Sequence, residues 1–224
     1  FTDFGKQLVG LAVADDASSS SNPEASRPPL FKLSEAGRLV PSSAETLTGI
    51  TGEATDEGPI VPTIPGGVLE QYRACGRVCG LALVSDCRLG LPFAHYFVRL
   101  LLDDEGATRP TLEEMQAELE REEPGFLATP AFLELPLAEH NLEDILTLSR
   151  QVTNAREGVE APLARNPATT VDDANKRLYL ERFLAHKLVT TIAQQASSFR
   201  EGLEEVVGEG RLSILTADEL GELW

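Results

Sequence analysis

The chain has little cysteine and few basic residues, and it lacks any long hydrophobic run. Its three cysteines all lie between Cys75 and Cys87, an arrangement that suits neither a disulfide framework nor a metal site with accompanying ligands. No stretch approaches the roughly 18 apolar residues of a membrane-spanning helix, and the first residues lack the basic and apolar order of a signal peptide. We therefore expect a soluble protein of the cytoplasm or nucleus, with reduced thiols and no cofactor.

Acidic residues far outnumber basic ones. The 224 residues include 36 acidic and 19 basic side chains, which give a formal net charge of −17. Nucleic acids and anionic membranes are bound through lysine and arginine, which displace counterions from phosphate groups. The charge therefore argues against nucleic acid and membrane as partners, and a basic protein surface is the more natural complement. The length allows one domain with a full core, with or without a small satellite.

Motifs that perform chemistry are also missing. The sequence contains no Gly-rich phosphate loop, H-E-x-x-H or C-x-x-C motif. Cys75 and Cys79 lie one helical turn apart without further ligands, so we interpret them as packing residues. Cys87 lies in a polar turn, where we expect it to be exposed but without a neighbouring base. His140 and His186 have no partner at a catalytic spacing, and we expect both at the surface or at an interface.

Two capping boxes mark the starts of helices. Thr111 with Glu114 predicts a helix that continues for about three turns, and Thr216 with Glu219 predicts another near the end of the chain. The acidic residues along the first of these helices are typical of a solvated face.

Other segments complete the prediction of an α+β protein that is mainly α, with small hairpins. A series of apolar residues spaced mostly three or four apart predicts one buried helical stripe that ends at Gly208. Residues 145–152 alternate in part and suit a short strand. Segments 15–28 and 42–67 have no apolar periodicity, so we interpret them as flexible surface insertions. The stripe consists of Phe183, Leu188, Ile192, Ala196, Phe199, Leu203 and Val206.

The segment 72–83 predicts a helix with an unusual glycine content. It places Gly76 and Gly80 one turn apart on one face, and Arg73 and Arg77 one turn apart on another. Glycine inside a helix costs roughly 1 kcal/mol relative to alanine. The pair of glycines therefore indicates the close approach of a neighbouring helix.

The same helix carries a resemblance to a known family. It reads Tyr-Arg at 72–73 and Gly-Leu-Ala-Leu at 80–83, and Leu-Pro-Phe at 91–93 then precedes a helix with Tyr-Phe. This order resembles the central helix of the N-terminal lobe, or N-lobe, of the HECT ubiquitin ligases. Upstream, Leu-Phe with a Ser-x-x-Gly turn and Leu-x-Pro, at 30–41, is similar to the hairpin of that lobe.

The resemblance continues downstream and covers about residues 1–224 with two gaps. Residues 171–180 are similar to the family's Val-Thr-Asn-x-Asn-Lys entry to a long helix. Residues 199–202 and 215–220 resemble two segments at the end of the lobe. The departures from the helix entry are Asp172, Asp173 and Ala174.

What the resemblance implies is a HECT N-lobe with two parts. A large subdomain is expected at about 1–110 and 155–224, and a small subdomain that binds a ubiquitin-conjugating enzyme at about 111–154. In the intact protein, ubiquitin would pass from the conjugating enzyme's thioester to a ligase cysteine and then to a substrate lysine. That cysteine belongs to a separate C-terminal lobe in a Thr-Cys-Phe-like context, which none of the three cysteines here resembles. We therefore expect this fragment to be inactive alone and to recruit the conjugating enzyme and its ubiquitin.

The resemblance also implies where the conjugating enzyme would dock. Carried over by position, a hydrophobic groove would lie on residues 126–148 and the start of the long helix, and it would receive a loop phenylalanine of the partner. Its acidic rim suits a basic protein, and alanine at position 138 makes the groove shallower. Leucines at this density are equally typical of the subdomain's own core. The groove residues are Leu127, Phe132, Ala138, Leu146, Leu148 and Tyr179, and the rim residues are Glu134, Glu139, Glu143 and Asp144.

Two alternatives stay open at this point. One is a non-catalytic interaction module that kept the fold of the lobe while its groove drifted, as the departures at Ala138, Asp172 and Asp173 indicate. The other is an unrelated acidic helical domain, which would require the ordered series of matches to be a coincidence.

Overall fold

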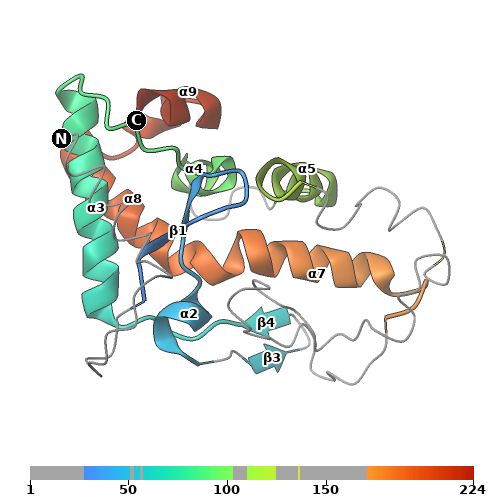
Figure 1. The fold of residues 1–224 in the computed structure, drawn as a ribbon. Helices are drawn as coiled ribbons and strands as arrows, with labels where there is room; N and C mark the ends of the chain where they lie inside the picture. The colour runs from blue at the N-terminus through green and yellow to red at the C-terminus, as the bar shows by residue number, and fades with distance from the viewer. Residues whose placement is uncertain (1–27, 51–52, 56–57, 103–109, 125–135, 137–170) are drawn as a thin grey trace, which may run out of the picture. The chain divides into compact units, whose positions relative to one another are not determined.

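The computed structural model describes residues 28–50, 53–55, 58–102, 110–124, 136 and 171–224. In these residues it is mainly helical with two small antiparallel sheets, which confirms the predicted fold class (Figure 1). The chain divides into two compact units. Unit 1 contains residues 1–42, 64–108 and 192–224, and unit 2 contains residues 43–63 and 109–191.

The elements of unit 1 are β1 (Phe31–Leu33), β2 (Leu39–Pro41), α3 (Gly66–Val84), α4 (His95–Leu102), α8 (Ala193–Val207), η3 (Arg211–Ile214) and α9 (Ala217–Leu223). The elements of unit 2 are α2 (Ala44–Thr48), β3 (Glu53–Thr55), β4 (Gly58–Ile60), α5 (Leu112–Glu122) and α7 (Lys176–Leu188). The short helix η2 (Thr190–Ile192) joins α7 to α8 along the chain. Within the described ranges, no helix combines the length and apolar composition that a bilayer crossing needs.

Helices α3 and α8 pack so closely that their crossing requires glycine. A Cβ on Gly76 would overlap the carbonyl oxygen of Phe199, and a Cβ on Gly202 would overlap the carbonyl oxygen of Arg73. A Cβ on Gly80 would lie 2.9 Å from a side-chain atom of α8. Figure 1 shows the two helices side by side. The close approach that the spaced glycines of α3 predict is therefore confirmed.

The arginines of α3 reach the same partner helix at its edge. Arg73 and Arg77 both donate hydrogen bonds to the carboxylate of Glu205 on α8. These hydrogen bonds lower the pKa of Glu205 and raise the pKa of both arginines. All three side chains are about a third exposed or more, so water and salt weaken the ion pairs. Shape at the glycines, rather than charge, fixes this crossing.

An aromatic cluster forms the core of unit 1 around Phe199. The centroid of its ring lies 5.4 Å from that of Phe97 and 5.7 Å from that of Phe93. The indole of Trp224 packs edge-on against Phe93 at 5.3 Å between centroids, and Phe31 joins from the hairpin. Such edge-to-face pairs are favourable beyond the area that they bury. The cluster thus ties together segments from both ends of the described chain.

The hairpin and the Leu-Pro-Phe segment form one local assembly. Strands β1 and β2 pair antiparallel, with Lys32 opposite Val40, and Gly37 makes the turn with a positive φ of 74°. The Leu39 amide donates to the carbonyl of residue 92 at 2.7 Å, and the Leu39 carbonyl accepts from the Ala94 amide at 2.9 Å. The predicted hairpin is confirmed, and the Leu-Pro-Phe segment pairs with its second strand.

The long apolar stripe belongs to two helices instead of one. Helix α7 ends at Leu188, and η2 separates it from α8. The hydroxyl of Thr190 donates to the carbonyl of Ala185 at 3.0 Å, and that of Thr191 donates to the carbonyl of Lys187 at 3.4 Å. Threonine hydroxyls that bond back to the preceding turn compete with the helical backbone pattern. The prediction of an uninterrupted stripe is wrong here, although six of its seven members are buried.

The segment 42–67 is not the surface loop that its composition indicates. Ser43 caps α2 by accepting from the Thr46 amide at 3.2 Å, and Gly49 ends the helix with a φ of 67°. Ser42, Ser43 and Glu45 are all buried. The start and stop signals of this five-residue helix are present in the sequence, but no apolar period accompanies them. Strands β3 and β4 add a second hairpin to the same segment.

Candidate partner-docking site

Most of the predicted groove lies outside the residues that the structure describes. This holds for Leu127, Phe132, Ala138, Leu146 and Leu148 and for the acidic rim, and also for the predicted strand at 145–152, for His140 and for nearly all of the insertion at 15–28. The assignment of these residues to a groove stays a prediction. The predicted small subdomain at about 111–154 is described only in α5 and the few residues around it.

Tyr179 is the one predicted groove residue in the described part of the chain. It lies in the first turn of α7, and its ring stacks on that of Phe183 with 6.1 Å between centroids. Burial raises the pKa of its hydroxyl to about 12. The residue is only 4% exposed in this structure. Its direct contact with a partner therefore stays a prediction. What the structure shows is that Tyr179 packs inside the protein at the start of α7.

The start of α7 is built by the residues that depart from the family pattern. The Asp172 carboxylate accepts from the amides of Ala174 and Asn175, both at 2.9 Å, and the Asn175 side chain accepts from the Asp172 amide at 2.9 Å. Asp173 forms an ion pair with Lys176 at 2.8 Å. Aspartate and asparagine favour such local side-chain to backbone bonds. Asp172 and Asp173 therefore stabilise the start of α7, the helix that carries Tyr179.

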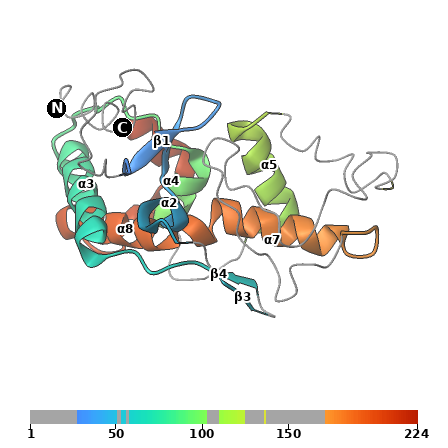
Figure 2. The ribbon, with the colours of Figure 1, turned by 60° about the horizontal axis from the view of Figure 1, so that its bottom comes forward.

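Helix α5 packs against α7 and is held by charge at both ends (Figure 2). Its capping box is confirmed, because Thr111 accepts from the Glu114 amide and Glu114 accepts from the Thr111 amide. Lys187 of α7 forms an ion pair with Glu123 at 2.6 Å. Arg177 lies 3.6 Å from Glu113 in a more exposed pair. The two helices are therefore joined by an ion pair near each end of α5.

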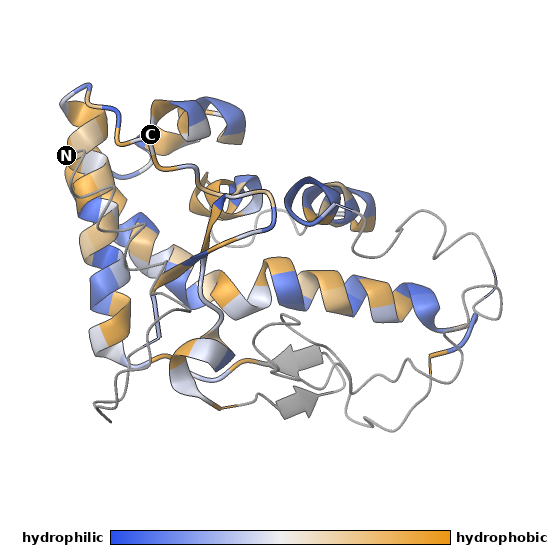
Figure 3. Cartoon of the chain, in the orientation of Figure 1, coloured by the Kyte–Doolittle hydropathy of each residue, from blue (hydrophilic) through white to orange (hydrophobic). Residues whose placement is uncertain are grey.

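The acidic face of α5 is only partly solvated. Figure 3 shows the helix as mostly hydrophilic, and Glu113, Glu114 and Glu120 are exposed as predicted. Glu118 and Glu122, however, are buried, at 7% and 2% exposure. The prediction of a solvated acidic face is therefore wrong for Glu118 and Glu122, because tertiary packing covers the side of α5 that also carries its apolar residues.

His186 is buried, which corrects its predicted place at a surface or interface. Its side chain has no exposed area, and its Nε2 atom lies 3.4 Å from the equally buried carboxylate of Glu45 on α2. Burial disfavours the charged imidazolium and lowers the pKa of His186 to about 4. No sequence pattern links the two residues, since they lie far apart in the chain. The two side chains thus lie close together in the interior of unit 2.

The two cysteines of α3 are suited to packing. Cys75 and Cys79 are buried, and burial raises the pKa of the Cys75 thiol to about 11 and raises that of Cys79 further. Both thiols are therefore protonated at neutral pH and poor nucleophiles. Cys87 is half-buried rather than exposed. In the described ranges, no group of three or more histidine, cysteine or acidic side chains is arranged to hold a metal ion.

Comparison with known proteins agrees with the resemblance in the sequence. The model of the HECT-domain (ubiquitin-transferase) family matches residues 18–224. The E3 ubiquitin-protein ligases HECW1 of Homo sapiens and of Mus musculus are each 29% identical to this chain over 155 residues. The aligned region is 68% of this chain but 9% of either relative, so the chain spans only a small part of their length. Because the family model covers nearly all of it, the chain belongs to the HECT-domain family.

Proposed function

We propose that this chain is the part of a HECT ubiquitin ligase that docks a ubiquitin-conjugating enzyme. In the intact protein, ubiquitin would then pass to a cysteine on a separate lobe and from there to substrate lysines. The observation that carries the proposal is the match of the HECT family model to residues 18–224. A place in the cytoplasm or nucleus, where such partners occur, is part of the proposal.

The internal structure of unit 2 supports docking at the start of α7. The Asp172 to Asn175 turn fixes the helix entry, and the pair between Lys187 and Glu123 holds α7 to α5. A groove must be preorganised to bind a partner loop without a large ordering cost. The chain's net charge of −17 favours a partner with a basic contact surface.

Docking is tested by titrating the chain against a panel of ubiquitin-conjugating enzymes, followed by calorimetry or amide chemical shifts. We expect micromolar binding by some members. Leu146→Arg should abolish binding while circular dichroism stays unchanged, because it places a charge in the proposed groove. Tyr179→Ala should weaken binding, and Tyr96→Ala in unit 1 is the matched control that should not. Absence of binding by every member of the panel would contradict the proposal.

We also propose that the chain alone forms no ubiquitin thioester. The buried, protonated thiols of Cys75 and Cys79 support this, because transfer requires an accessible thiolate. The test incubates the chain with a conjugating enzyme charged with ubiquitin and runs the products on non-reducing gels. A band on the chain that disappears with a reducing agent would show that one of its cysteines accepts ubiquitin and would refute the idea.

The alternative of a drifted, non-catalytic module has less support than the sequence indicates. Two of the three departures that favour it, Asp172 and Asp173, bond within the entry of α7 and so have a structural reason. Only Ala138 is left, outside the described residues. Binding to conjugating enzymes decides between the two functions.

A further inference from the structure

The chain contains far fewer lysines than arginines. Of the 19 basic residues, four are lysine and the other 15 are arginine. The four lysines are Lys6, Lys32, Lys176 and Lys187. Both residue types supply positive charge to a surface, so charge alone does not explain this choice.

None of the three lysines in the described part of the chain belongs to its exposed residues. Lys187 is 9% exposed, and its Nζ atom lies 2.6 Å from the carboxylate of Glu123. Lys176 is 12% exposed, and its Nζ atom lies 2.8 Å from the carboxylate of Asp173. Lys32 in β1 is half-buried. Lysine is ordinarily one of the most exposed residue types and is buried only when paired, so two lysines of three with side chains at most 12% exposed is an unusual arrangement.

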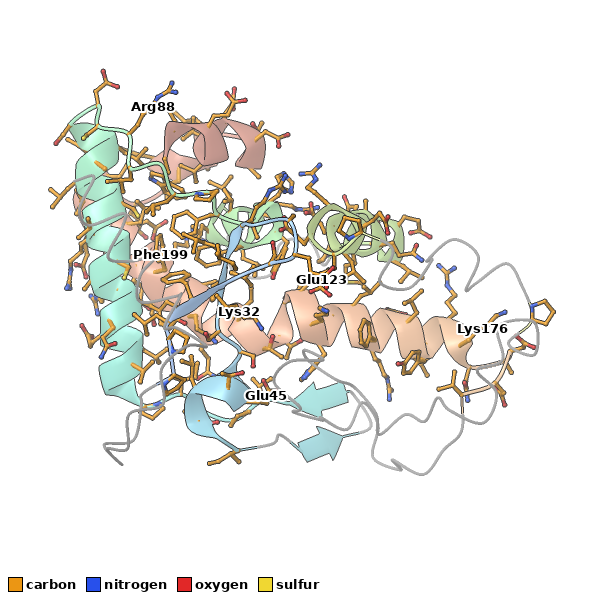
Figure 4. The ribbon with its side chains drawn as sticks, in the orientation of Figure 1. Lys32, Glu45, Arg88, Glu123, Lys176 and Phe199 are labelled. Carbon is orange, nitrogen blue, oxygen red and sulfur yellow. The ribbon has the colours of Figure 1, made fainter. Side chains whose placement is uncertain are left out.

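Four of the ten arginines in the described residues, by contrast, are exposed. Arg88, Arg121, Arg177 and Arg211 are all exposed, and the side chain of Arg88 points away from the helices in Figure 4. Arg177 directly follows Lys176 on α7 and is 66% exposed. Both neighbours have a carboxylate partner, but the Arg177 side chain is 66% exposed whereas that of Lys176 is 12% exposed.

The two side chains differ in their reaction with thioesters. A lysine ammonium first loses a proton to solvent, and its nitrogen then attacks the thioester carbonyl. The new N–C bond forms as the C–S bond breaks, the sulfur leaves as thiolate, and the second proton of the amine goes to solvent. The arginine guanidinium stays protonated at any physiological pH and is not a nucleophile in this reaction. Lysine is thus an acceptor of acyl groups, and arginine is not.

We propose that lysines are few in this chain, and shielded in the part that the structure describes, so that a ubiquitin thioester brought to it is not discharged onto the chain itself. This inference depends on the docking function proposed above, because docking is what would bring the thioester close. A lysine in an ion pair and below the surface must break its pair and emerge before its nitrogen reaches a carbonyl carbon. The exposed arginines supply solubility and charge without supplying an acceptor.

The test measures acylation of each amine by N-hydroxysuccinimide acetate, a small acyl donor, in the native chain. Peptide mass spectrometry gives the rate for each lysine. Two variants provide accessible reference amines, Arg177→Lys in unit 2 and Arg88→Lys in unit 1, and both keep the charge of the native residue. We expect Lys176 and Lys187 to react about tenfold more slowly than either introduced lysine, because they react only after local opening.

Two further measurements make the result decisive. Glu123→Gln should raise the rate at Lys187 alone, and Asp173→Asn should raise the rate at Lys176 alone, while acylation in concentrated urea should equalise all sites. Rates at Lys176 and Lys187 within about twofold of the reference amines would overturn the proposal. The outcome does not depend on a conjugating enzyme, whereas docking is judged by the separate titration, so the failure of one idea is distinct from the failure of the other.

Discussion

Unit 1 and unit 2 are stabilised by different means. Unit 1 is stabilised by close packing, through glycine contacts between α3 and α8 and an aromatic cluster around Phe199. The described part of unit 1 buries no carboxylate or imidazole. Unit 2 buries four such groups, which are Glu45, Glu118, Glu122 and His186. Charged groups are costly to bury unless they are paired.

This difference predicts how the stability of each unit responds to added side-chain volume and to pH. A tightly packed apolar core responds strongly to added volume and weakly to pH, because it holds few groups that titrate. A unit with buried acids and a histidine responds to pH, since its folded and unfolded states bind protons differently. We expect unit 1 to act as the rigid scaffold and unit 2 to change its stability with conditions.

The largest expected effect comes from adding one methyl group at the helix crossing of unit 1. Gly76→Ala or Gly202→Ala would place a Cβ onto a backbone carbonyl oxygen of the partner helix. Backbone atoms cannot move aside as a side chain can, so the helices must separate. We expect each change to lower the free energy of unfolding by about 3 kcal/mol or more, measured by urea denaturation. The matched control is Gly221→Ala in α9, where a Cβ meets nothing within 4 Å, and it should leave stability equal or slightly raised.

The second largest expected effect is a loss of stability of unit 2 at acid pH. The pKa of His186 is about 4 in the folded protein, against 6.5 for the ordinary imidazole. Because the unfolded chain binds the proton more readily, the contribution is fully present above pH 6.5 and is lost as the pH falls toward 4. The difference corresponds to a loss of about 3 kcal/mol in the free energy of unfolding, measured by denaturation at a series of pH values.

Comparison of variants isolates this contribution from that of the carboxylates. His186→Gln removes the titrating ring, so its stability should fall less steeply between pH 6.5 and 4 than that of the parent chain. His95→Gln in unit 1 is the control and should retain the steep fall. An unchanged pH profile for His186→Gln would mean that the buried acids of unit 2, and not the histidine, govern its response to acid.

The smallest expected effect comes from removing the capping box that each unit contains. Thr111 in unit 2 and Thr216 in unit 1 each accept from the amide of a glutamate three residues on, at 3.2 Å in both cases. Thr111→Ala and Thr216→Ala should each cost about 1 kcal/mol of stability, measured by thermal unfolding. Thr111→Ser and Thr216→Ser keep the hydroxyl and should restore most of it. A much larger cost at Thr111 would indicate that α5 is a critical element of unit 2.

The sequence predicts those features that depend on near neighbours. Both capping boxes, the hairpin with its turn at Gly37 and the glycine face of α3 follow from spacings within one or two turns. The loop prediction for 42–67 is wrong because α2 has caps but no apolar period. The break at Thr190 is missed because side chains that bond back to the helix compete with a continuous apolar pattern.

For the candidate site, the sequence alone determines the ordered HECT motifs and hence the family. The position of Tyr179 on α7 also follows from the sequence, since it depends on the helix entry four residues before it. Only the tertiary structure decides that Tyr179 and His186 are buried, that Glu45 faces His186, and that Lys187 is paired with Glu123. The physical reason is that capping, turn formation and helical period are local, whereas burial and charge pairing depend on which distant segments the fold brings together.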